Sequence, residues 1–379
     1  MRVAHSFAPD ARTAAKEFYE AVYQPDLALA LFFCSVHYDL GELAQELKRL
    51  FQNVPVIGCT TCGEIGPSGY ISRSLSGVSF SPSFCTAAVG HLDNLQAFQD
   101  ASGRALAAEL VGKLDSAHAE SARGHRFAFM MIDGLSVREE GVTHAMQKGL
   151  GDIPLFGGSA GDDQEYDRTW VYYDGAFHTD AAVLAVIETP YLFKIFKTQH
   201  FTAGEERLVV TDADAVHRIV KEINGLPAAA EYARVIGART EELNAEHFSA
   251  FPVVVRVNGA NYVRSILSAN PDGSLTFYCA IDRGLILRVA QGVDLVENLR
   301  QTFDDLTTVL GPLQLVIACD CVLRNLEIAR KGLRPAVEEL FRRNHAIGFS
   351  TYGEQYRGVH INQTLTGLAV GGLRSDAHE

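Results

Sequence analysis

Apolar runs of strand length recur along the chain, and a segment with helical spacing follows each of them. The runs cover residues 27–34, 127–132 and 313–318. Such uninterrupted runs are typical of strands that are buried on both faces of a parallel sheet. After the first run, Asp39 can cap a helix whose leucines recur every three or four residues. The pattern therefore predicts a strand, a helix and a second, shorter strand in each unit.

A glycine-rich segment follows the shorter strand and is repeated along the chain. Residues 58–64 (GCTTCGE) and 348–354 (GFSTYGE) share one pattern, and residues 157–162 (GGSAGD) form a copy that is one residue shorter. Glycine permits positive φ, and the hydroxyl and carboxylate side chains offer hydrogen bonds, so we predict a tight polar loop. The candidate ligand contacts in these loops are Thr60, Thr61, Glu64, Ser159, Asp162, Ser350, Thr351 and Glu354.

Three units of strand, helix, strand, glycine loop and strand predict an α/β protein. A region with α+β character lies between the second and third units, and residues 212–224 in it are predicted to be helical. We expect two mixed-sheet domains, residues 1–225 and 226–379, because residues 224–227 interrupt two helical patterns. The loops should lie at the carboxyl ends of the strands, where such sheets bind ligands.

A hairpin is predicted in the second unit around Asp174-Gly175. This dipeptide is a common two-residue hairpin turn, and residues 169–173 and 181–187 on either side of it have strand patterns. We therefore expect these two segments to pair with each other.

Composition narrows the classes of function. The chain has 379 residues, of which 47% are hydrophobic and 21% charged, as in a globular protein of two or three domains. The net charge of −13 and the absence of a basic run argue against binding to nucleic acids or membrane surfaces. No apolar run reaches the ~18 residues of a membrane span. We expect a cytoplasmic protein whose seven cysteines are reduced thiols.

The glycine loops suggest several chemistries. They lack the phosphate-binding patterns GxxxxGK[ST] and GxGxxG, and their acids would repel phosphate. Ser159 and Thr60 could be nucleophiles, but a carboxylate in such a loop most often accepts hydrogen bonds from backbone N–H groups rather than taking part in catalysis. Cys59 and Cys62 have the CxxC spacing of a redox pair or half a zinc site. The third loop has Phe349 and Tyr352 instead, which favours a structural role.

Two histidines are candidates for haem ligation. A haem iron needs a single histidine that points into an apolar pocket. His200 lies in an aromatic, strand-like segment (residues 196–201), and His360 follows the third loop. For either residue alone, a hydrogen-bonded structural role is the more common one. The chain has no CxxCH pattern, which excludes covalently attached haem.

The repeated loops and their surroundings resemble a known family. Residues 56–65 with Gly69-Tyr70 resemble the signature of the FIST N-terminal domain, and residues 348–354 with 360–364 resemble that of the FIST C-terminal domain. Five further segments resemble the haem-binding, nitric-oxide-sensing NosP branch: residues 132–140, 157–163, 198–201, 262–266 and 319–324. The resemblance covers residues 27–371. It departs from the pattern at Cys62, usually a small apolar residue, and at Asn325, where the branch tends to have arginine.

The resemblance implies a sensor with no catalytic activity. It implies haem b held by His200, with His360 as the other candidate ligand and with Arg264 and Arg324 as candidate partners of the propionates. Nitric oxide on the iron would change a partner protein, a histidine kinase or a cyclic-di-GMP synthase or phosphodiesterase. A homo-oligomer is left open. The alternatives are a FIST sensor of another small ligand, such as an amino acid, and a thiol or zinc switch at Cys59 and Cys62.

Overall fold

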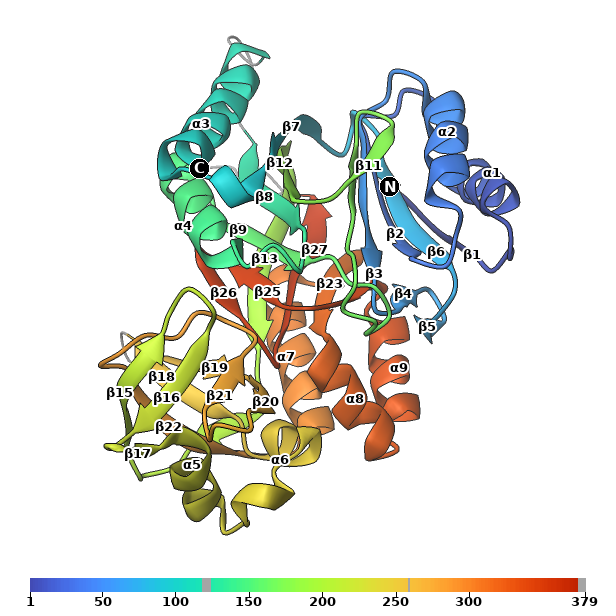
Figure 1. Cartoon of the computed structure of the whole chain (residues 1–379). Coiled ribbons are helices and arrows are strands. Elements are labelled where there is room, and N and C mark those ends of the chain that lie inside the picture. Colours follow the sequence, from blue (N-terminus) through green and yellow to red (C-terminus); the bar gives the residue numbers. More distant parts are fainter. Residues whose placement is uncertain (118–123, 258–259, 374–379) are drawn as a thin grey trace, which may run out of the picture.

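The computed structural model describes residues 1–117, 124–257 and 260–373, and it contains one repeated unit in three copies (Figure 1). The first unit comprises β1 (Arg2–Ser6), α1 (Ala11–Val22), β2 (Leu29–Ser35), α2 (Leu40–Phe51), β3 (Val56–Thr61), β4 (Glu64–Gly66), β5 (Gly69–Ile71) and β6 (Leu75–Phe80). The second comprises β7 (Thr86–Asp93), the short helix η1 (Leu95–Ala97), α3 (Asp100–Ala117), β8 (His125–Ile132), α4 (Glu139–Leu150), β9 (Leu155–Ser159), β10 (Val171–Tyr173), β11 (Ala176–His178) and β12 (Ala181–Thr189). The third comprises β13 (Tyr191–Thr198), α7 (Leu295–Leu310), β23 (Leu315–Cys321), α8 (Val322–Arg330), α9 (Arg334–Arg343), β24 (Ala346–Thr351), β25 (Glu354–Tyr356), β26 (Val359–Ile361) and β27 (Leu365–Leu373).

Each unit forms a four-stranded sheet, and its hairpin pairs with the edge of another unit's sheet. The orders β1-β6-β2-β3, β7-β12-β8-β9 and β13-β27-β23-β24 correspond strand for strand, and the last pair in each order is parallel. The hairpin β4-β5 of the first unit extends the third sheet, β25-β26 of the third extends the second, and β10-β11 of the second extends the first. The exchange is cyclic, so the three units form one body. The predicted α/β class with mixed sheets is confirmed.

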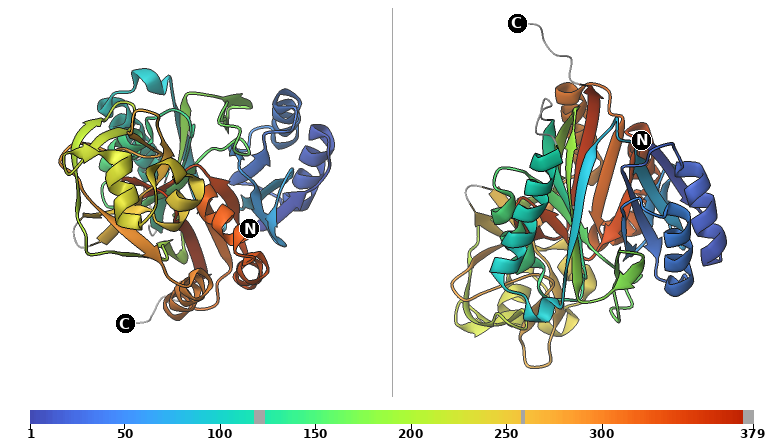
Figure 2. Two further views of the ribbon diagram at one scale, coloured as in Figure 1. Left: turned by 60° about the horizontal axis from the view of Figure 1, so that its bottom comes forward. Right: turned by 90° about the horizontal axis from the view of Figure 1, so that it is seen from above.

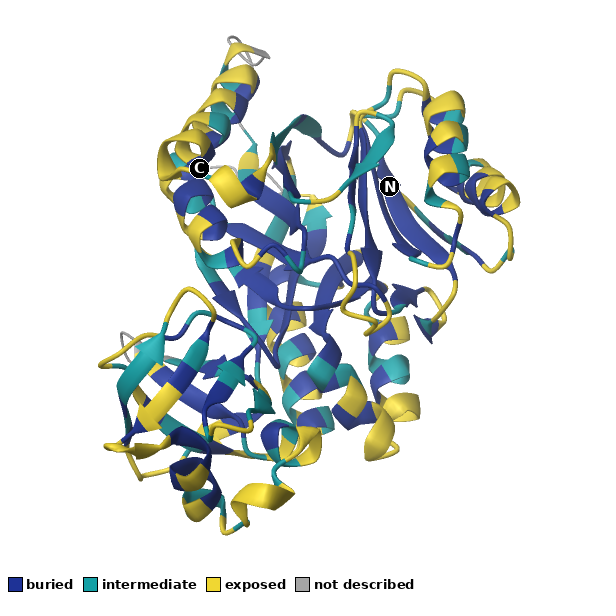
Figure 3. Ribbon diagram, in the orientation of Figure 1, coloured by how far each residue is buried: buried dark blue, intermediate teal, exposed yellow. Residues whose placement is uncertain are grey.

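The inner faces of the three sheets share one apolar core. Phe33 of the first sheet stacks on Phe349 of the third with ring centroids 4.6 Å apart, and its edge faces Phe129 of the second. The outer faces are covered by α1 and α2, by α3 and α4, and by α7 and α9 (Figure 2). Each central strand is therefore buried on both faces (Figure 3). This double burial explains the continuous apolar runs in the sequence.

A separate nine-stranded sheet is inserted into the third unit between β13 and α7. We call residues 199–292 the insert. It comprises β14 (Phe201–Ala203), β15 (Leu208–Asp214), β16 (Ile219–Ile223), β17 (Leu226–Pro227), α5 (Ala228–Ile236), the short helix η2 (Thr240–Glu242), α6 (Ala245–Ala250), β18 (Val253–Val257), β19 (Ala260–Arg264), β20 (Ile266–Ala269), β21 (Leu275–Phe277) and β22 (Ile286–Gly292). It has its own apolar core around Tyr232 and Phe248. Gly225, the expected domain boundary, lies in the turn between the paired strands β16 and β17.

Three local predictions were wrong. Residues 212–224 form parts of β15 and β16 rather than a helix, because Val220 and Ile223 are buried in the core of the insert. The turn at Asp174-Gly175 exists, but it joins β10 to β11. The expected second arm is β12, which pairs with β7 and β8 instead.

The third error concerns the glycine segments, whose first half is strand rather than loop. The close approach of the neighbouring parallel strand explains the glycines, because a Cβ on Gly157 would lie 2.0 Å from the carbonyl oxygen of Met130. A Cβ on Gly348 would lie 1.8 Å from the carbonyl oxygen of Ala318. The tight turn is confined to the residues that follow Thr61, Ser159 and Thr351.

Candidate functional site

Glu64 and Glu354 occupy two copies of the same buried cage. The hydroxyl of Thr61 donates to one oxygen of Glu64 (2.6 Å), and the hydroxyl of Ser74 donates to the other (2.5 Å). Thr351 and Thr364 donate to Glu354 in the same way, at 2.6 Å each. Burial raises the pKa of Glu64 to about 7 and that of Glu354 to about 8. Both carboxyls join the turn to the start of the closing strand, ten residues later.

Asp162 has a different role from the other two acids. Its carboxylate accepts hydrogen bonds from the backbone N–H groups of residues 166, 167 and 168 at 3.0, 2.7 and 2.9 Å, and from the hydroxyl of Tyr352. Val171 is the residue of the second unit that is equivalent to Glu64 of the first. Val171 pairs with Cys59 across the sheet, and Glu64 pairs with Phe349 at the same position of another sheet. The second unit therefore has an apolar residue where the other two have a buried acid.

The three loops meet in a ring of backbone hydrogen bonds. The N–H of Gly161 donates to the carbonyl oxygen of Thr60 (2.9 Å). In the same way, the N–H of Cys62 donates to the carbonyl oxygen of Ser350 (3.0 Å), and the N–H of Tyr352 donates to that of Ser159 (3.4 Å). All eight loop residues singled out in the sequence are at most 1% exposed. Thr60 accepts from the backbone of Trp170, and Ser159 accepts from Gln355. The polar groups of these loops thus bind one another and hold the three units together.

The two cysteines of the first loop lie in different apolar clusters. Cys59 belongs to the central core, and Cys62 packs with Val322 and Tyr352. Burial raises the pKa of both thiols, that of Cys62 to about 12, which disfavours the reactive thiolate. Across the part of the chain that the structure describes, no three His, Cys, Asp or Glu side chains are grouped to hold a metal ion.

His200 lies at the junction between the insert and α8. The ring is 1% exposed, its centroid is 4.2 Å from that of Phe201, and Nε2 is 2.9 Å from Oε2 of Glu327. Burial opposes ionisation of Glu327, but hydrogen bonds from His200 and Lys331 hold its pKa below the usual value. An ionised carboxylate only accepts, so Nε2 donates a proton to Glu327. Nδ1 is buried and has no hydrogen-bond partner among the described residues.

A cavity of about 460 Å³ lies next to two neighbours of this histidine, Phe201 and Glu327, which line it, whereas His200 itself is not one of the lining residues. Phe201 and Phe251 contribute apolar surface, and Arg330 and Lys331 contribute positive charge. Glu246 and Glu327 also line the cavity and pair with Arg330 and Lys331 at 3.9 and 2.7 Å, so its charges are balanced. The sequence indicated His200 as a candidate but not Glu327, Arg330 or Lys331. These three residues follow His200 by more than 120 positions and fit the pattern of an ordinary helix.

The other candidate haem residues lie elsewhere. The ring of His360 packs on backbone, since a Cβ on Gly353 would be 2.2 Å from its Cε1, and burial lowers its pKa to about 4. Arg264 donates to the carbonyl oxygen of His360 at 3.1 Å. Arg324 is buried and donates to Asp320 at 2.8 Å. Neither arginine lines the cavity beside His200.

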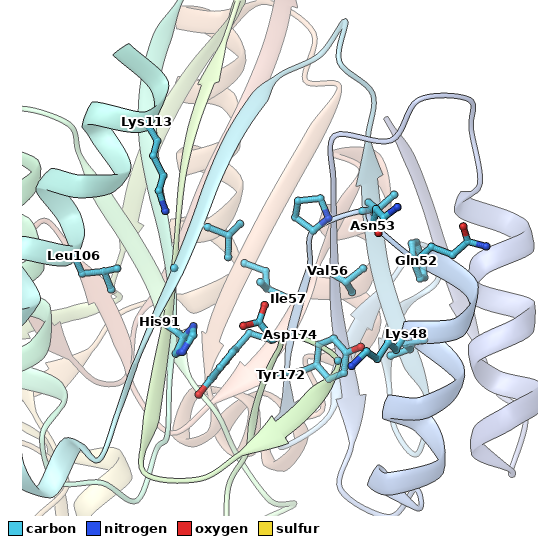
Figure 4. A pocket seen from close by; sticks show the side chains of 18 of the residues that line it. Lys48, Gln52, Asn53, Val56, Ile57, His91, Leu106, Lys113, Tyr172 and Asp174 are labelled. Atoms are coloured by element: carbon cyan, nitrogen blue, oxygen red, sulfur yellow. The ribbon is translucent and has the colours of Figure 1, made fainter. Parts of the chain in front are cut away.

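A larger cavity of about 730 Å³ separates the first and second units. Lys48 of α2 and Lys113 of α3 extend toward it from opposite sides (Figure 4). Glu109 and Asp174 also line it, and Glu109 pairs with Lys113 at 2.8 Å, so its charges are mixed. It lies near Val56 at the amino end of β3, opposite the repeat loops.

Comparisons with known proteins identify two adjoining domains. The FIST N domain matches residues 28–226, and the FIST C domain matches residues 228–357. An uncharacterized protein of Methanocaldococcus jannaschii, MJ1623, is 22% identical over 382 residues, which cover 90% of this chain and 73% of that protein. A crystal structure of chorismatase is similar with a TM-score of 0.36 and 9% identity, over 92% of this chain and 94% of that one. In the described residues, no helix is long and apolar enough to cross a membrane.

Proposed function

The chain belongs to the FIST family, whose domains are those of signal-transduction sensors that bind small ligands, and we propose that this member is a haem-based sensor of nitric oxide. The observation that carries the proposal is the Nδ1 of the buried His200, which has no hydrogen-bond partner among the described residues, while Glu327 holds the ring through Nε2. A histidine held in one orientation, next to a cavity with apolar and charged side chains, can serve as a haem ligand.

The residues around His200 fit the parts of a haem group. Phe201 and Phe251 offer apolar contacts to the porphyrin, and Arg330 and Lys331 can pair with the propionates. Glu327 is a positioning residue, since it fixes which nitrogen of His200 is free. When bound, the haem supplies an iron atom that takes up nitric oxide.

We propose that the output is a change in a partner and not a reaction. The cavity lies between the insert and α8, so a ligand there contacts both parts of the molecule. A ligand that binds one arrangement more tightly shifts the population toward it. The proposed partner is a histidine kinase or a cyclic-di-GMP synthase or phosphodiesterase.

Absorption spectroscopy on the full chain tests this proposal. Titration with haem should give a saturable Soret band that shifts when nitric oxide is added to the ferrous form. His200→Ala should abolish or change the band, whereas His360→Ala, the matched control, should leave it unchanged. Glu327→Gln should weaken haem binding about 10- to 100-fold, as expected when an orienting partner is lost.

Two results would overturn the proposal. One is the absence of a saturable band with the folded wild-type chain. The other is an unaltered spectrum in His200→Ala. If His200→Ala does not fold, the double variant Arg330→Gln with Lys331→Gln changes only partly or fully exposed charges, and it must weaken haem binding if these residues hold the propionates.

A further inference from the structure

A second cavity lies at the opposite side of the insert, against the second unit. It has a volume of about 550 Å³. Residues 134–138 after β8, together with Tyr166 and Tyr352, form one wall, and residues 216–218, 267 and 276–278 of the insert form the other. We propose that this cavity binds a small carboxylate with an aromatic body, independently of haem. The proposal rests on the charge, the shape and the backbone of the cavity.

The charged residues that line the cavity favour an anionic ligand. None of the described residues that line the cavity is acidic, although the chain as a whole has a net charge of −13. Two of its three basic residues are already paired: Arg218 contacts Glu139 and Glu140 at 2.7 Å each, and His217 contacts Asp214 at 2.8 Å.

Arg138 remains available. It is exposed, and within the described residues the only hydrogen bond of its guanidinium is one of 3.4 Å to the side-chain oxygen of Gln96. The side-chain nitrogen of Gln96 in turn donates to Asp180 at 3.4 Å. A guanidinium binds a carboxylate through two parallel hydrogen bonds, so Arg138 is suited to the head of the ligand.

The apolar and aromatic residues that line the rest of the cavity favour a ligand with a flat apolar ring. Val216 and Leu267 of the insert are 72% and 40% exposed, and Val137 faces them from the second unit with 44% exposure. Tyr166 stacks on Tyr352 with ring centroids 4.8 Å apart and planes inclined by 8°. Exposed apolar side chains gathered around a cavity mark a binding site, and an aromatic ring would continue the stack and cover them.

Backbone strain is concentrated in the walls of the same cavity. Val137, Tyr166 and Arg218 have φ angles of 57°, 53° and 57°. The left-handed region is unfavourable for residues with a Cβ, and especially for a β-branched valine. Such conformations persist where the surrounding structure imposes them, and they gather at ligand sites. Here they hold three cavity-lining side chains in place before any ligand arrives.

Calorimetric titration of the haem-free full chain with three matched compounds tests the proposal. The probes are 3-phenylpropanoate, its neutral amide, and phenylalanine, which adds an ammonium group to the same skeleton. We expect saturable binding of 3-phenylpropanoate and at least tenfold weaker binding of the amide, which lacks the charge for Arg138. Phenylalanine should also bind at least tenfold more weakly, because none of the described residues that line the cavity offers a carboxylate to its ammonium group.

Variants assign the binding to this cavity. Arg138→Gln should weaken binding of the carboxylate at least tenfold and change that of the amide little. Val216→Asp should weaken both, because it places an acid on the apolar wall. The controls are Arg12→Gln on α1 and Val309→Asp on α7, two exposed residues outside the cavity.

Four outcomes would overturn the proposal: no saturable binding of 3-phenylpropanoate, equal binding of the amide, equal or tighter binding of phenylalanine, and unchanged binding in Arg138→Gln. Because the measurement needs no haem and the variants leave His200 intact, its outcome does not depend on the proposed haem site.

Discussion

At the scale of single residues, the chain uses two of its repeated acids as neutral groups. Glu64 and Glu354 are fully buried, and each oxygen of either carboxyl accepts a hydroxyl hydrogen bond. No cation is bonded to either carboxyl among the described residues, so burial dominates and the protonated form persists to about pH 7 or 8. The sequence identified both acids as loop-fixing residues. It did not identify Ser74 and Thr364, although both follow their acid by ten residues.

Glu354→Gln should flatten the pH dependence of stability. An unfolded glutamate titrates near pH 4.3 and Glu354 in the folded chain near pH 8, so the folded state binds more protons between these values. The free energy of unfolding therefore falls as the pH rises from about 5 to 8, on the order of 4 kcal/mol for this group. Glutamine keeps the shape and one acceptor oxygen, and its NH2 group donates where the other carboxyl oxygen accepts, but it does not titrate. Urea unfolding at pH 5 and 8 measures the difference.

The matched control for this experiment is Glu20→Gln, on the exposed face of α1. It should reproduce the wild-type dependence on pH. If Glu354→Gln also reproduces it, Glu354 is ionised in the folded protein and its cage does not protect the neutral form.

At the scale of elements, burial on both faces decided what could be predicted. The strands β2, β8 and β23 give continuous apolar runs because helices cover one face and the central core covers the other. The edge strands β1 and β7 are only partly buried, and their mixed sequences gave no signal. The hairpin exchange was also hidden, since strands of three residues pair with partners far away in the sequence.

Gly157→Ala tests the close approach of β8 and β9. The added Cβ would overlap the backbone carbonyl oxygen of Met130, and backbone cannot give way as a side chain can. We expect destabilisation of about 3 kcal/mol or more, measured by chemical unfolding. Gly112→Ala in α3 is the control, because a Cβ there meets nothing within 4 Å. It should stabilise the helix by about 0.5–1 kcal/mol. Equal effects of the two changes would contradict the explanation given for the repeated glycines.

At the scale of the whole molecule, the sites proposed here lie where the insert meets the three-unit body. One cavity faces α8 of the third unit and the other faces the second unit. The sequence predicted single residues of these sites, such as His200, from local patterns. It could not predict Glu327 opposite His200, which depends on how the insert packs on α8, or the stack of Tyr166 on Tyr352, which depends on how the second and third units meet. A ligand in either cavity would act on the same junction.

A buried ion-pair cluster fixes this junction, and its removal should loosen the insert. Arg218 stands just before β16 and binds Glu139 and Glu140 at the start of α4, each at 2.7 Å. The backbone N–H of Ala280 also donates to Glu140, at 2.5 Å. Arg218→Met leaves the buried Glu139 without its partner, a loss typically of about 3–5 kcal/mol. Hydrogen exchange should speed up in β16, in β21 and at the start of α4, and little in the central core.

Two further variants distinguish a local effect of losing the ion-pair cluster from a general loss of stability of the whole chain. Glu139→Gln added to Arg218→Met removes the unpaired buried charge, so it should restore part of the lost stability. Arg300→Gln on α7 removes exposed ion pairs with Glu297 and Asp304 and should cost less than about 1 kcal/mol. If exchange in Arg218→Met rises evenly over the whole chain, the insert and the three units unfold together, and the cluster does not act as a local clamp. Faster exchange confined to the junction would instead mark the insert as the element that a bound ligand can reposition.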